Sequence, residues 1–547
     1  MTSLAAPDRP DSSSAAPAAA AAGGGLLMLA AGQFLMTLDT SVMNVSIADV
    51  AHDIGTTVTG IQTAITLYAL VMASLMITGN KIGSIVGRRR AFSLGCLIYG
   101  LGSFITALSP NLTVLLIGWS GLEGIGAALI MPAIVGLVAA NFGQADRPRA
   151  YGLIASAGAI AVAVGPLIGG LVTTYASWRL VFLGEDVVVA VILVFARRLH
   201  DVAPEHRPKL DLVGTVLSAL GLGLTVFGIL QSSEWGWIQP KGDTAWLGLS
   251  PTIWLILGGA AIVYLFSRWE LAVVRKGGEP LVKPGMLKNL RLRLGLTMFF
   301  FQYLIQGGLF FVVPLFLSVV LGLSAAATGV RLLPLSVTLL VAAVAVPRFR
   351  PHASPRRVVR LGLLALLLAV VALVAAMDAG AGAEITTIPM LFAGLGIGML
   401  ASQLGSVTVS SVPENETGEV GGLQNTGSNL GTSIGTALVG SVLIAALTSS
   451  FLNGITQNPA VPPEVSSQAS VELASGVPFV SDEQLETALL DAGVDQATTD
   501  AIVQENVDAR IAALRTSLSL LALLTLLALF FTPGLPTVQA SDEPRSG

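Results

Sequence analysis

Four carboxylates lie in stretches of the chain that are otherwise apolar: Asp39, Glu123, Glu185 and Asp186. At the centre of a lipid bilayer an ionised carboxylate costs about 2.5–3.5 kcal/mol on insertion scales, so it needs a proton or a bound cation to offset its charge. A carboxylate that exchanges one for the other can couple two transported species. Ser120 lies one helical turn from Glu123, on the same face. These four acids are the candidates for proton and substrate coupling.

Each acid also has a structural interpretation. Asp39 can hydrogen-bond Asn44 or a helix terminus, and Arg179 can screen Glu185 and Asp186 from six or seven residues away. No Lys or Arg lies deep in the first six apolar stretches apart from Arg179, which is near the outer end of its stretch. A permanent ion pair is therefore the weaker explanation for Asp39 and Glu123.

The composition places these acids in a membrane protein. Hydrophobic residues make up 53% of the 547 residues, charged residues only 11%, and the mean hydropathy is +0.78, far from the values of soluble proteins. Apolar runs of roughly 18–25 residues, long enough to cross about 30 Å of hydrocarbon, recur along the chain. The sequence predicts an all-α polytopic membrane protein with about fourteen transmembrane helices. They begin near Leu26, Ile61, Ala91, Leu112, Tyr151, Leu180, Leu212, Leu247, Leu292, Thr328, Val358, Ile385, Leu423 and Leu514.

Basic residues gather in alternate loops, which the positive-inside rule places in the cytoplasm. They occupy residues 88–90, 147–149, 197–209, 268–293 and 348–360. An even number of spans then leaves both termini in the cytoplasm. The expected location of the protein is the inner (cytoplasmic) membrane. The opposite loops contain few basic residues, and the longest of them, residues 451–509, is acidic. Ser481 and Gln484 there form a capping-box pattern, which predicts a small helical hairpin that is an exit cap, a docking surface or a passive connector.

The remaining reactive side chains favour no metal or cofactor. The lone Cys96 lies inside an apolar span, where it excludes an intrachain disulfide and a thiolate metal site. His52, His200, His206 and His352 lie at or near loops without ligand spacing. The net charge of −4 gives no indication of nucleic acid as a partner, and no nucleotide-binding loop or nucleophile elbow indicates an enzyme.

Two parts of the chain repeat each other. The segment that starts at Thr59-Gly60 and ends on basic residues before Gly95 is similar to the segment that starts at Thr328-Gly329 and ends before Gly362. Duplicated bundles are common in transporters. We therefore expect two six-helix bundles related by a parallel repeat, with two inserted helices between them. The predicted regions are a disordered tail (1–24), the first bundle (25–199), the inserted helices and linker (200–291), the second bundle (292–532) and a cytoplasmic tail (533–547).

The fifth span contains Gly165 and Pro166, followed by Gly169 and Gly170. Proline removes one backbone hydrogen bond, and the glycines allow a neighbouring helix to approach closely. This Gly-Pro-x-x-Gly-Gly pattern resembles the antiporter signature of the major facilitator superfamily, in particular its fourteen-span drug:proton antiporters. Ordinary close packing of small residues is the alternative.

Further motifs carry the same resemblance over most of the chain. Residues 38–45, with Asp39 and Asn44, look like the first-span motif of these antiporters, and Gly427, Gly431 and Gly435 form one smooth face in a segment similar to their thirteenth span. The loop between spans two and three ends similarly, on Gly87, Arg88, Arg89 and Arg90. In this family the cleft-lining spans would contribute Asn44, Tyr68, Trp119, Ser120, Gln302, Gln306 and Asn425.

The chain also departs from the family patterns. Ser84-Ile85 stands where the loop motif has Asp-Arg, Ser120 replaces the Arg of the fourth span, and Ser428 replaces that of the thirteenth. Glu185-Asp186-Val187 stands where the sixth span of the family usually reads Asn-x-Pro. Coupling mechanisms that use the missing loop Asp or fourth-span Arg therefore do not transfer to this chain.

The sequence predicts a monomeric proton-coupled efflux antiporter for hydrophobic, cationic or zwitterionic drug-like compounds, working by alternating access. Its expected partners are a small-molecule substrate, protons and the lipid bilayer. Two alternatives remain open: a transporter of a specific endogenous solute or lipid on the same scaffold, and a membrane sensor or scaffold that transports nothing.

Overall fold

The protein is described by a computed structural model that covers residues 12–142, 147–197, 199, 201, 209–241, 244–378, 380–412, 416–473 and 476–538. Within those residues, thirteen helices are long and apolar enough to cross a membrane. This confirms the expected all-α membrane fold. The expected sixth span is α8 (Arg179–Ala196), whose 18 residues include three charged side chains. It packs against other spans, on α4 (Arg88–Ala107) and α1 (Ser12–Val45).

The two predicted bundles contain corresponding helices. Apolar length makes spans of these helices apart from α8, and capping residues such as Thr57 and Ser324 set where spans begin. The first bundle also holds α3 (Val58–Val86), α5 (Leu112–Leu115), a π-helical segment η1 (Leu116–Glu123), α6 (Gly124–Asn141) and α7 (Arg147–Tyr175). The second holds α11 (Leu290–Leu315), α12 (Ala325–Phe349), α13 (Pro355–Ala376), α14 (Thr387–Val409), α15 (Thr417–Gln457) and α18 (Gln496–Phe531).

The same helix pairs pack together in both bundles. In the first, α1 packs on α7, α6 on α3 and α4, and α4 on α8. In the second, α11 packs on α15, α14 on α12 and α13, and α13 on α18. Because the pairing follows the same chain order in both halves, the repeat is a parallel one, as predicted. Gly431 and Gly435 lie directly against the α11 backbone, so the expected smooth face of α15 is used for packing.

The two halves meet along two seams. One joins α7 to α12, where a Cβ on Gly170 would meet the backbone of Ala325, and one on Gly329 would meet that of Pro166. The other joins α3 to α15: the Gln62 amide donates to the Thr436 carbonyl at 3.2 Å.

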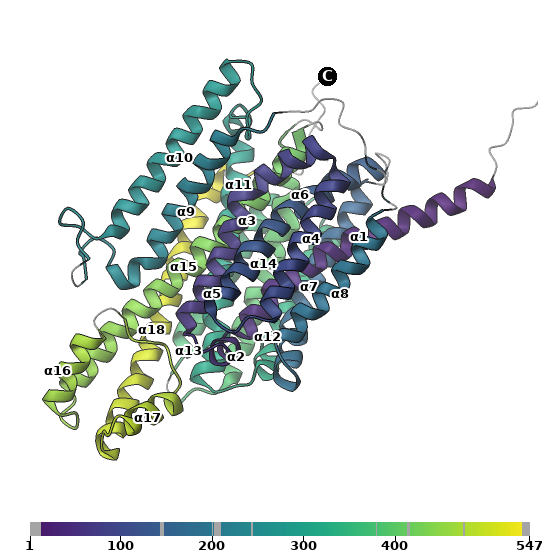
Figure 1. Cartoon of the computed structure of the whole chain (residues 1–547). Coiled ribbons are helices and arrows are strands. Elements are labelled where there is room, and N and C mark those ends of the chain that lie inside the picture. Colours follow the sequence, from purple (N-terminus) through teal and green to yellow (C-terminus); the bar gives the residue numbers. More distant parts are fainter. Residues whose placement is uncertain are drawn as a thin grey trace, which may run out of the picture.

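The two inserted helices, α9 (Leu212–Trp235) and α10 (Pro251–Arg275), lie at one edge of the molecule in Figure 1. Helix α9 contacts both α3 and α15, and α10 packs mainly on α9. Only 11% of the α10 span is buried within the protein, so most of this helix is available to lipid.

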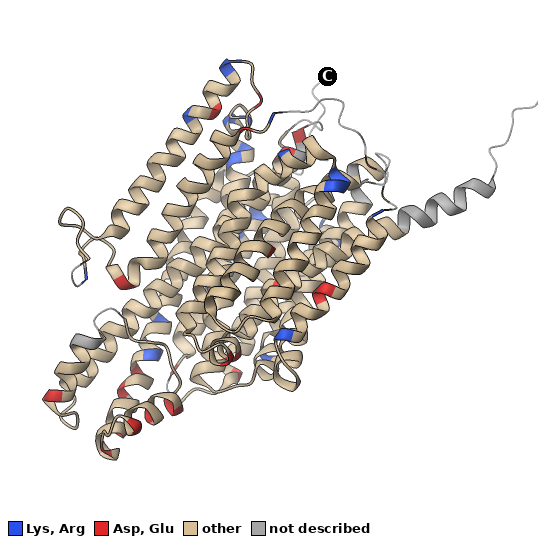
Figure 2. Ribbon diagram, viewed as in Figure 1, with Lys and Arg blue, Asp and Glu red and all other residues tan. Residues whose placement is uncertain are grey.

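Charge separates the two ends of the helices (Figure 2). We call the end with Arg88 and Arg356 the basic end. The opposite, acidic end carries Asp53 on α2 (Ile47–Asp53) and the short helices α16 (Pro463–Glu472) and α17 (Asp482–Asp491). At the basic end the linker after α10 is held to both halves. Glu279 pairs with Lys81 of α3 at 2.9 Å and Lys283 pairs with Glu419 of α15 at 2.8 Å.

The helices extend further than their apolar sequence predicts. Residues 12–24, expected to be disordered, belong to α1, whose first turns are rich in alanine, the strongest helix former; residues 1–11 lie outside the described residues. Helix α15 continues to Gln457 and α18 begins at Gln496, so the connection at the acidic end is shorter than 451–509. The capping box is confirmed, because Ser481 and Gln484 bond reciprocally at the start of α17.

Candidate functional site

The π-helical segment η1 positions two of the predicted site residues. A π-helix has a wider turn than an α-helix and is found often at functional sites. Gly102 and Gly118 allow α4 and η1 to approach closely, since a Cβ on Gly118 would lie 2.9 Å from the Gly102 carbonyl oxygen. Trp119 and Glu123 are both fully buried there.

Three of the four predicted acids come together inside the first bundle. Asp39 of α1, Glu123 of η1 and Glu185 of α8 each offer a carboxylate oxygen, and these atoms lie within 4.8 Å of one another. All three side chains are buried. We call this group the carboxylate triad. Like charges this close in a medium of low dielectric repel strongly, so the triad is most stable when protons or a small cation neutralise part of its charge.

Neutral donors hold the triad in place. The Trp119 indole nitrogen lies 2.9 Å from both Asp39 oxygens. From α4, Thr106 donates to Glu123 at 3.1 Å, and Tyr99 and Ser103 donate to Glu185 at 3.1 and 3.2 Å. One oxygen each of Glu123 and Glu185 has no hydrogen-bond partner among the described residues. Spare acceptor sites in a buried carboxylate group are suited to taking up protons.

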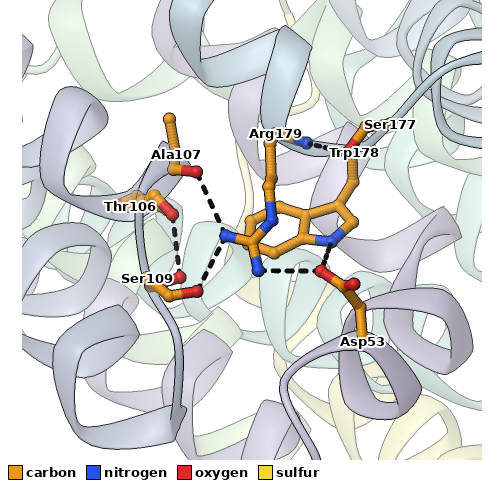
Figure 3. A network of polar contacts seen from close by, with 7 residues as sticks. All are labelled: Asp53, Thr106, Ala107, Ser109, Ser177, Trp178 and Arg179. Carbon is orange, nitrogen blue, oxygen red and sulfur yellow. Dashed lines mark hydrogen bonds and ion pairs between the residues drawn. The ribbon is translucent and has the colours of Figure 1, made fainter.

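No basic side chain among the described residues forms an ion pair with the triad. The nearest candidate from the sequence, Arg179, is used at the acidic end of α8 (Figure 3). There it pairs with Asp53 at 2.8 Å, donates to the Ala107 and Ser109 carbonyls, and lies over the Trp178 ring. It therefore screens neither Glu185 nor Asp186 directly.

The Arg179 network is linked to the triad through α4. Figure 3 shows Ser109 donating to the Thr106 carbonyl, at 2.8 Å, while its own carbonyl accepts from Arg179. The Thr106 side chain donates in turn to Glu123. Asp53 and Trp178 line an open vestibule of about 870 Å³ at the acidic end, together with His52 and the first residues of α17. Polar groups thus connect the vestibule with the buried acids.

A central cavity of about 220 Å³ lies between the two halves. Its lining contains amide, hydroxyl, thioether and aromatic side chains, and no charged side chain among the described residues. Four of the predicted cleft residues line it: Asn44, Tyr68, Gln306 and Asn425. The lining also includes Gln33, Met36, Thr37, Thr40, Ser41, Met72, Met131, Tyr303, Phe310, Ser428, Asn429 and Thr432.

The triad lies behind the cavity wall. Asp39, Glu123 and Glu185 do not belong to the lining, although Thr40, the neighbour of Asp39, does. Tyr68 separates the two sites: its ring stacks on Trp119 with centroids 5.0 Å apart and an interplanar angle of 6°. Trp119 then bonds Asp39. The cavity and the acids are therefore neighbours joined by an aromatic pair.

The structure places the other predicted site residues around this centre. Ser120 is buried and donates to the Ala64 carbonyl at 2.8 Å, and Gln302 is buried without lining the cavity. Asp186 is half-buried and lies outside the triad. Its carboxylate is beside Gly100 of α4, because a Cβ atom added to Gly100 would be 3.4 Å from it.

The glycine motif of α7 serves close packing. A Cβ on Gly165 would lie 2.5 Å from that of Ser41, and one on Gly169 would lie 2.8 Å from the Val42 side chain. Gly170 and Pro166 form the seam with α12. The motif therefore brings α7 against α1, next to Asp39, and against the second half.

The loop motif has a different acid from the expected one. Gly87 adopts a left-handed φ of 102°, and Arg88 donates to the Asn80 side chain at 2.7 Å. Asp201, beyond the end of α8, accepts from the Arg89 backbone N–H at 3.2 Å at the start of α4. Arg90 is exposed. Asp201 therefore caps the start of α4. Because Asp201 is more than a hundred residues from this loop in the sequence, the sequence alone did not indicate this role.

Comparisons with known proteins agree with this architecture. The family model of the Major Facilitator Superfamily matches residues 29–436. The tetracenomycin C resistance and export protein of Streptomyces glaucescens is 29% identical over 427 residues, 76% of this chain and 75% of that protein. The puromycin resistance protein of Streptomyces alboniger is 29% identical over 445 residues, 79% and 84% of the two chains.

A solved structure gives the same fold. The inward-facing, unoccupied crystal structure of a bacterial homologue of the human lysosomal transporter Spinster superposes with a TM-score of 0.61 at 14% identity, covering 94% of this chain and 98% of that one. A family match over most of the sequence, a parallel repeat of six helices and a cavity between the halves all point to one conclusion. The chain belongs to the major facilitator superfamily.

Proposed function

We propose that the protein is a proton-coupled efflux antiporter that exports hydrophobic drug-like compounds by alternating access. The observation that carries the proposal is the carboxylate triad, buried beside a central cavity and without a basic partner among the described residues. Such a group changes its charge by taking up and releasing protons. The export of tetracenomycin C by one relative, as its name states, supports the outward direction.

The positive-inside rule supports the orientation. The basic end faces the cytoplasm, both termini lie on that side, and the acidic end opens outside the inner membrane. Cargo then enters the central cavity from the basic end and leaves through the vestibule. Protons travel the opposite way, from the vestibule to the triad. The two halves rock about the α7–α12 and α3–α15 seams, and the chain works as a monomer.

The position of the triad relative to the cavity bears on how cargo and protons are coupled. The expectation of a cationic or zwitterionic cargo assumed that the cargo and the proton compete for one carboxylate. Because the triad lies outside the cavity lining, cargo and protons bind at adjacent sites. The state of one site must therefore reach the other through Tyr68 and Trp119.

Reconstituted vesicles test this function. The purified protein is incorporated into liposomes that contain a pH-sensitive dye, and a panel including tetracenomycin C and puromycin is added with an imposed proton gradient. We expect compound uptake and proton efflux to occur together. Both should be lost in Asp39→Asn and in Glu123→Gln, because these variants remove titratable groups of the triad while keeping side-chain size.

Asp500→Asn is the matched control, since Asp500 is exposed on α18 far from the triad in the chain. It should exchange protons for compound at the rate of the unaltered protein. Retained proton-driven exchange in both triad variants would defeat the proposal.

A further inference from the structure

The wall between the central cavity and the triad has an unused hydrogen-bonding group. Tyr68 lines the cavity and is only 2% exposed. Its ring stacks on Trp119, whose indole nitrogen donates to Asp39, and in this conformation no described residue forms a hydrogen bond with its hydroxyl group. A buried hydroxyl without a partner costs about 1–3 kcal/mol. This group can donate one hydrogen bond and accept another.

The chemistry of the cavity selects against a charged cargo. Its described lining has no charged side chain to pair with an ion, and an unpaired ion loses several kcal/mol of hydration on entering such a site. The amides of Gln306 and Asn425 suit neutral polar groups, while Met72, Tyr303 and Phe310 suit the faces and edges of aromatic rings.

We infer that the cargo is an uncharged aromatic compound bearing a hydroxyl group, which donates a hydrogen bond to the Tyr68 oxygen while the Tyr68 hydroxyl donates to Asp39. This inference rests on the proposed function and names its substrate class. It also names Tyr68 as the residue that transmits the state of Asp39 to the cargo. The observations that carry it are the uncharged lining, the free Tyr68 hydroxyl and the place of Tyr68 between the two sites.

The direction of the two hydrogen bonds gives the sign of coupling. An ionised Asp39 is the better acceptor, and it polarises the Tyr68 hydroxyl so that the oxygen accepts more strongly from the cargo. Cargo binding therefore favours the ionised triad and releases a proton. Proton uptake weakens the chain of hydrogen bonds and releases the cargo. This mutual exclusion is the requirement for antiport.

Other titratable groups around Asp39 share the proton without facing the cargo. Glu123 of η1 and Glu185 of α8 lie in the triad, and Tyr99 of α4 donates to Glu185. None of these three lines the cavity. Tyr68 is the lining residue that stacks on Trp119, the donor to Asp39, so the hydroxyl of Tyr68 is the group to remove in a test.

Three naphthalene probes separate charge from hydrogen-bond donation. Naphthol is uncharged and donates, methoxynaphthalene has the same ring without the donor, and naphthyltrimethylammonium carries a permanent charge. Binding to the purified protein in detergent is measured by calorimetry, and proton release is measured in weak buffer with a pH indicator. We expect naphthol to bind about tenfold more tightly than methoxynaphthalene and to be the probe that releases protons.

Tyr68→Phe removes the hydroxyl and keeps the ring. We expect its affinity for naphthol to fall to that for methoxynaphthalene, with proton release lost. Asp39→Asn should also lose proton release, because its side chain cannot release a proton, and should bind naphthol more weakly than the unaltered protein does, because a neutral amide is a weaker acceptor than a carboxylate. Tyr264→Phe is the control, since Tyr264 is exposed on α10, and it should behave as the unaltered protein does.

Two results would overturn the inference: tighter binding of the trimethylammonium probe than of naphthol, or an unchanged naphthol affinity and proton release in Tyr68→Phe. A fold control is the binding of methoxynaphthalene, which should persist in every variant. The proposed function fails separately. If naphthol binds through Tyr68 as described but vesicles exchange no protons for any compound, the binding site stands and the antiport is refuted.

Discussion

Replacing Gly329 by alanine should open the seam between the two halves at the acidic end. A Cβ at this position would meet the Pro166 carbonyl of α7, which is backbone and cannot rotate away. Insertion of a methyl group into a packed contact typically costs about 1–3 kcal/mol. The proposed alternating access requires α7 and α12 to separate when the acidic end opens, so that cost would apply to the closed state and shift the population toward the open state by roughly 5- to 150-fold.

Cysteine labelling can measure this shift. Cys96 is the single cysteine, so Cys96→Ser provides a background without thiols. Ser336 is 2% exposed and lines a small cavity between the halves, about three turns from the acidic end of α12. In a Ser336→Cys protein, a membrane-impermeant maleimide applied from the acidic side should react faster when Gly329→Ala is present, within the range given above.

Two further variants make the test specific. Gly170→Ala would meet the Ala325 backbone across the same seam and should act in the same direction. Gly258→Ala on α10 has no atom within 4 Å of the added Cβ and should leave labelling unchanged. If labelling is unaltered or slower in both seam variants, the α7–α12 contact is not what closes the acidic end.

Four other outcomes are expected. Lys283→Gln should raise labelling of Ser336→Cys from the basic side by no more than about fivefold, because the half-exposed pair with Glu419, whose hydrogen bond raises the pKa of Lys283, contributes at most about 1 kcal/mol; Lys283→Arg, which keeps the charge, should leave the rate unchanged. Ser481→Ala should speed amide hydrogen exchange in α17 but not in α8, since the lost capping box stabilises the helix start by about 0.5–2 kcal/mol. Arg179→Gln should lower the thermal unfolding midpoint in detergent without changing naphthol affinity, because it removes the ion pair with Asp53 and the hydrogen bond to the Ala107 carbonyl. Exchange of an uncharged cargo for protons moves net charge, so a potential negative on the basic side should accelerate it, at about 2.3 kcal/mol per elementary charge for 100 mV; an electroneutral exchange would contradict an uncharged cargo.

The fold follows from the sequence because membrane insertion depends mainly on apolar length. Long apolar runs and small-residue faces are local properties, and thirteen of the fourteen predicted spans are long and apolar enough in the described residues to cross a membrane. The packing of the glycines also agrees with the structure. The sixth span shows the limit of this reasoning: Arg179, Glu185 and Asp186 reduce its hydropathy, and its position is set by packing on α1 and α4.

The composition of the site was predictable, but its division into two parts was not. Asp39 and Thr40 are adjacent in the chain and point about 100° apart around the helix, so one faces the triad and the other the cavity. The π-helical turn that contains Trp119 and Glu123 also changes the directions in which these side chains point, compared with an α-helix. One signal was available: Tyr99, Ser103 and Thr106 recur at helical spacing along span three, and all three donate to the triad.

Helix α9 covers one of the two seams between the halves on the side that faces the lipid. Thr215 of α9 lies 3.2 Å from Thr78 of α3, and its Ile229 carbonyl accepts from Ser441 of α15. This helix therefore covers the seam between α3 and α15, whereas the described helix in contact with both α7 and α12 is α1 of the first bundle. A cargo molecule dissolved in the bilayer would meet an inserted helix at the first seam before it could reach the cavity. One flank of the transporter is thus shielded from lipid-borne cargo by a helix outside the two bundles.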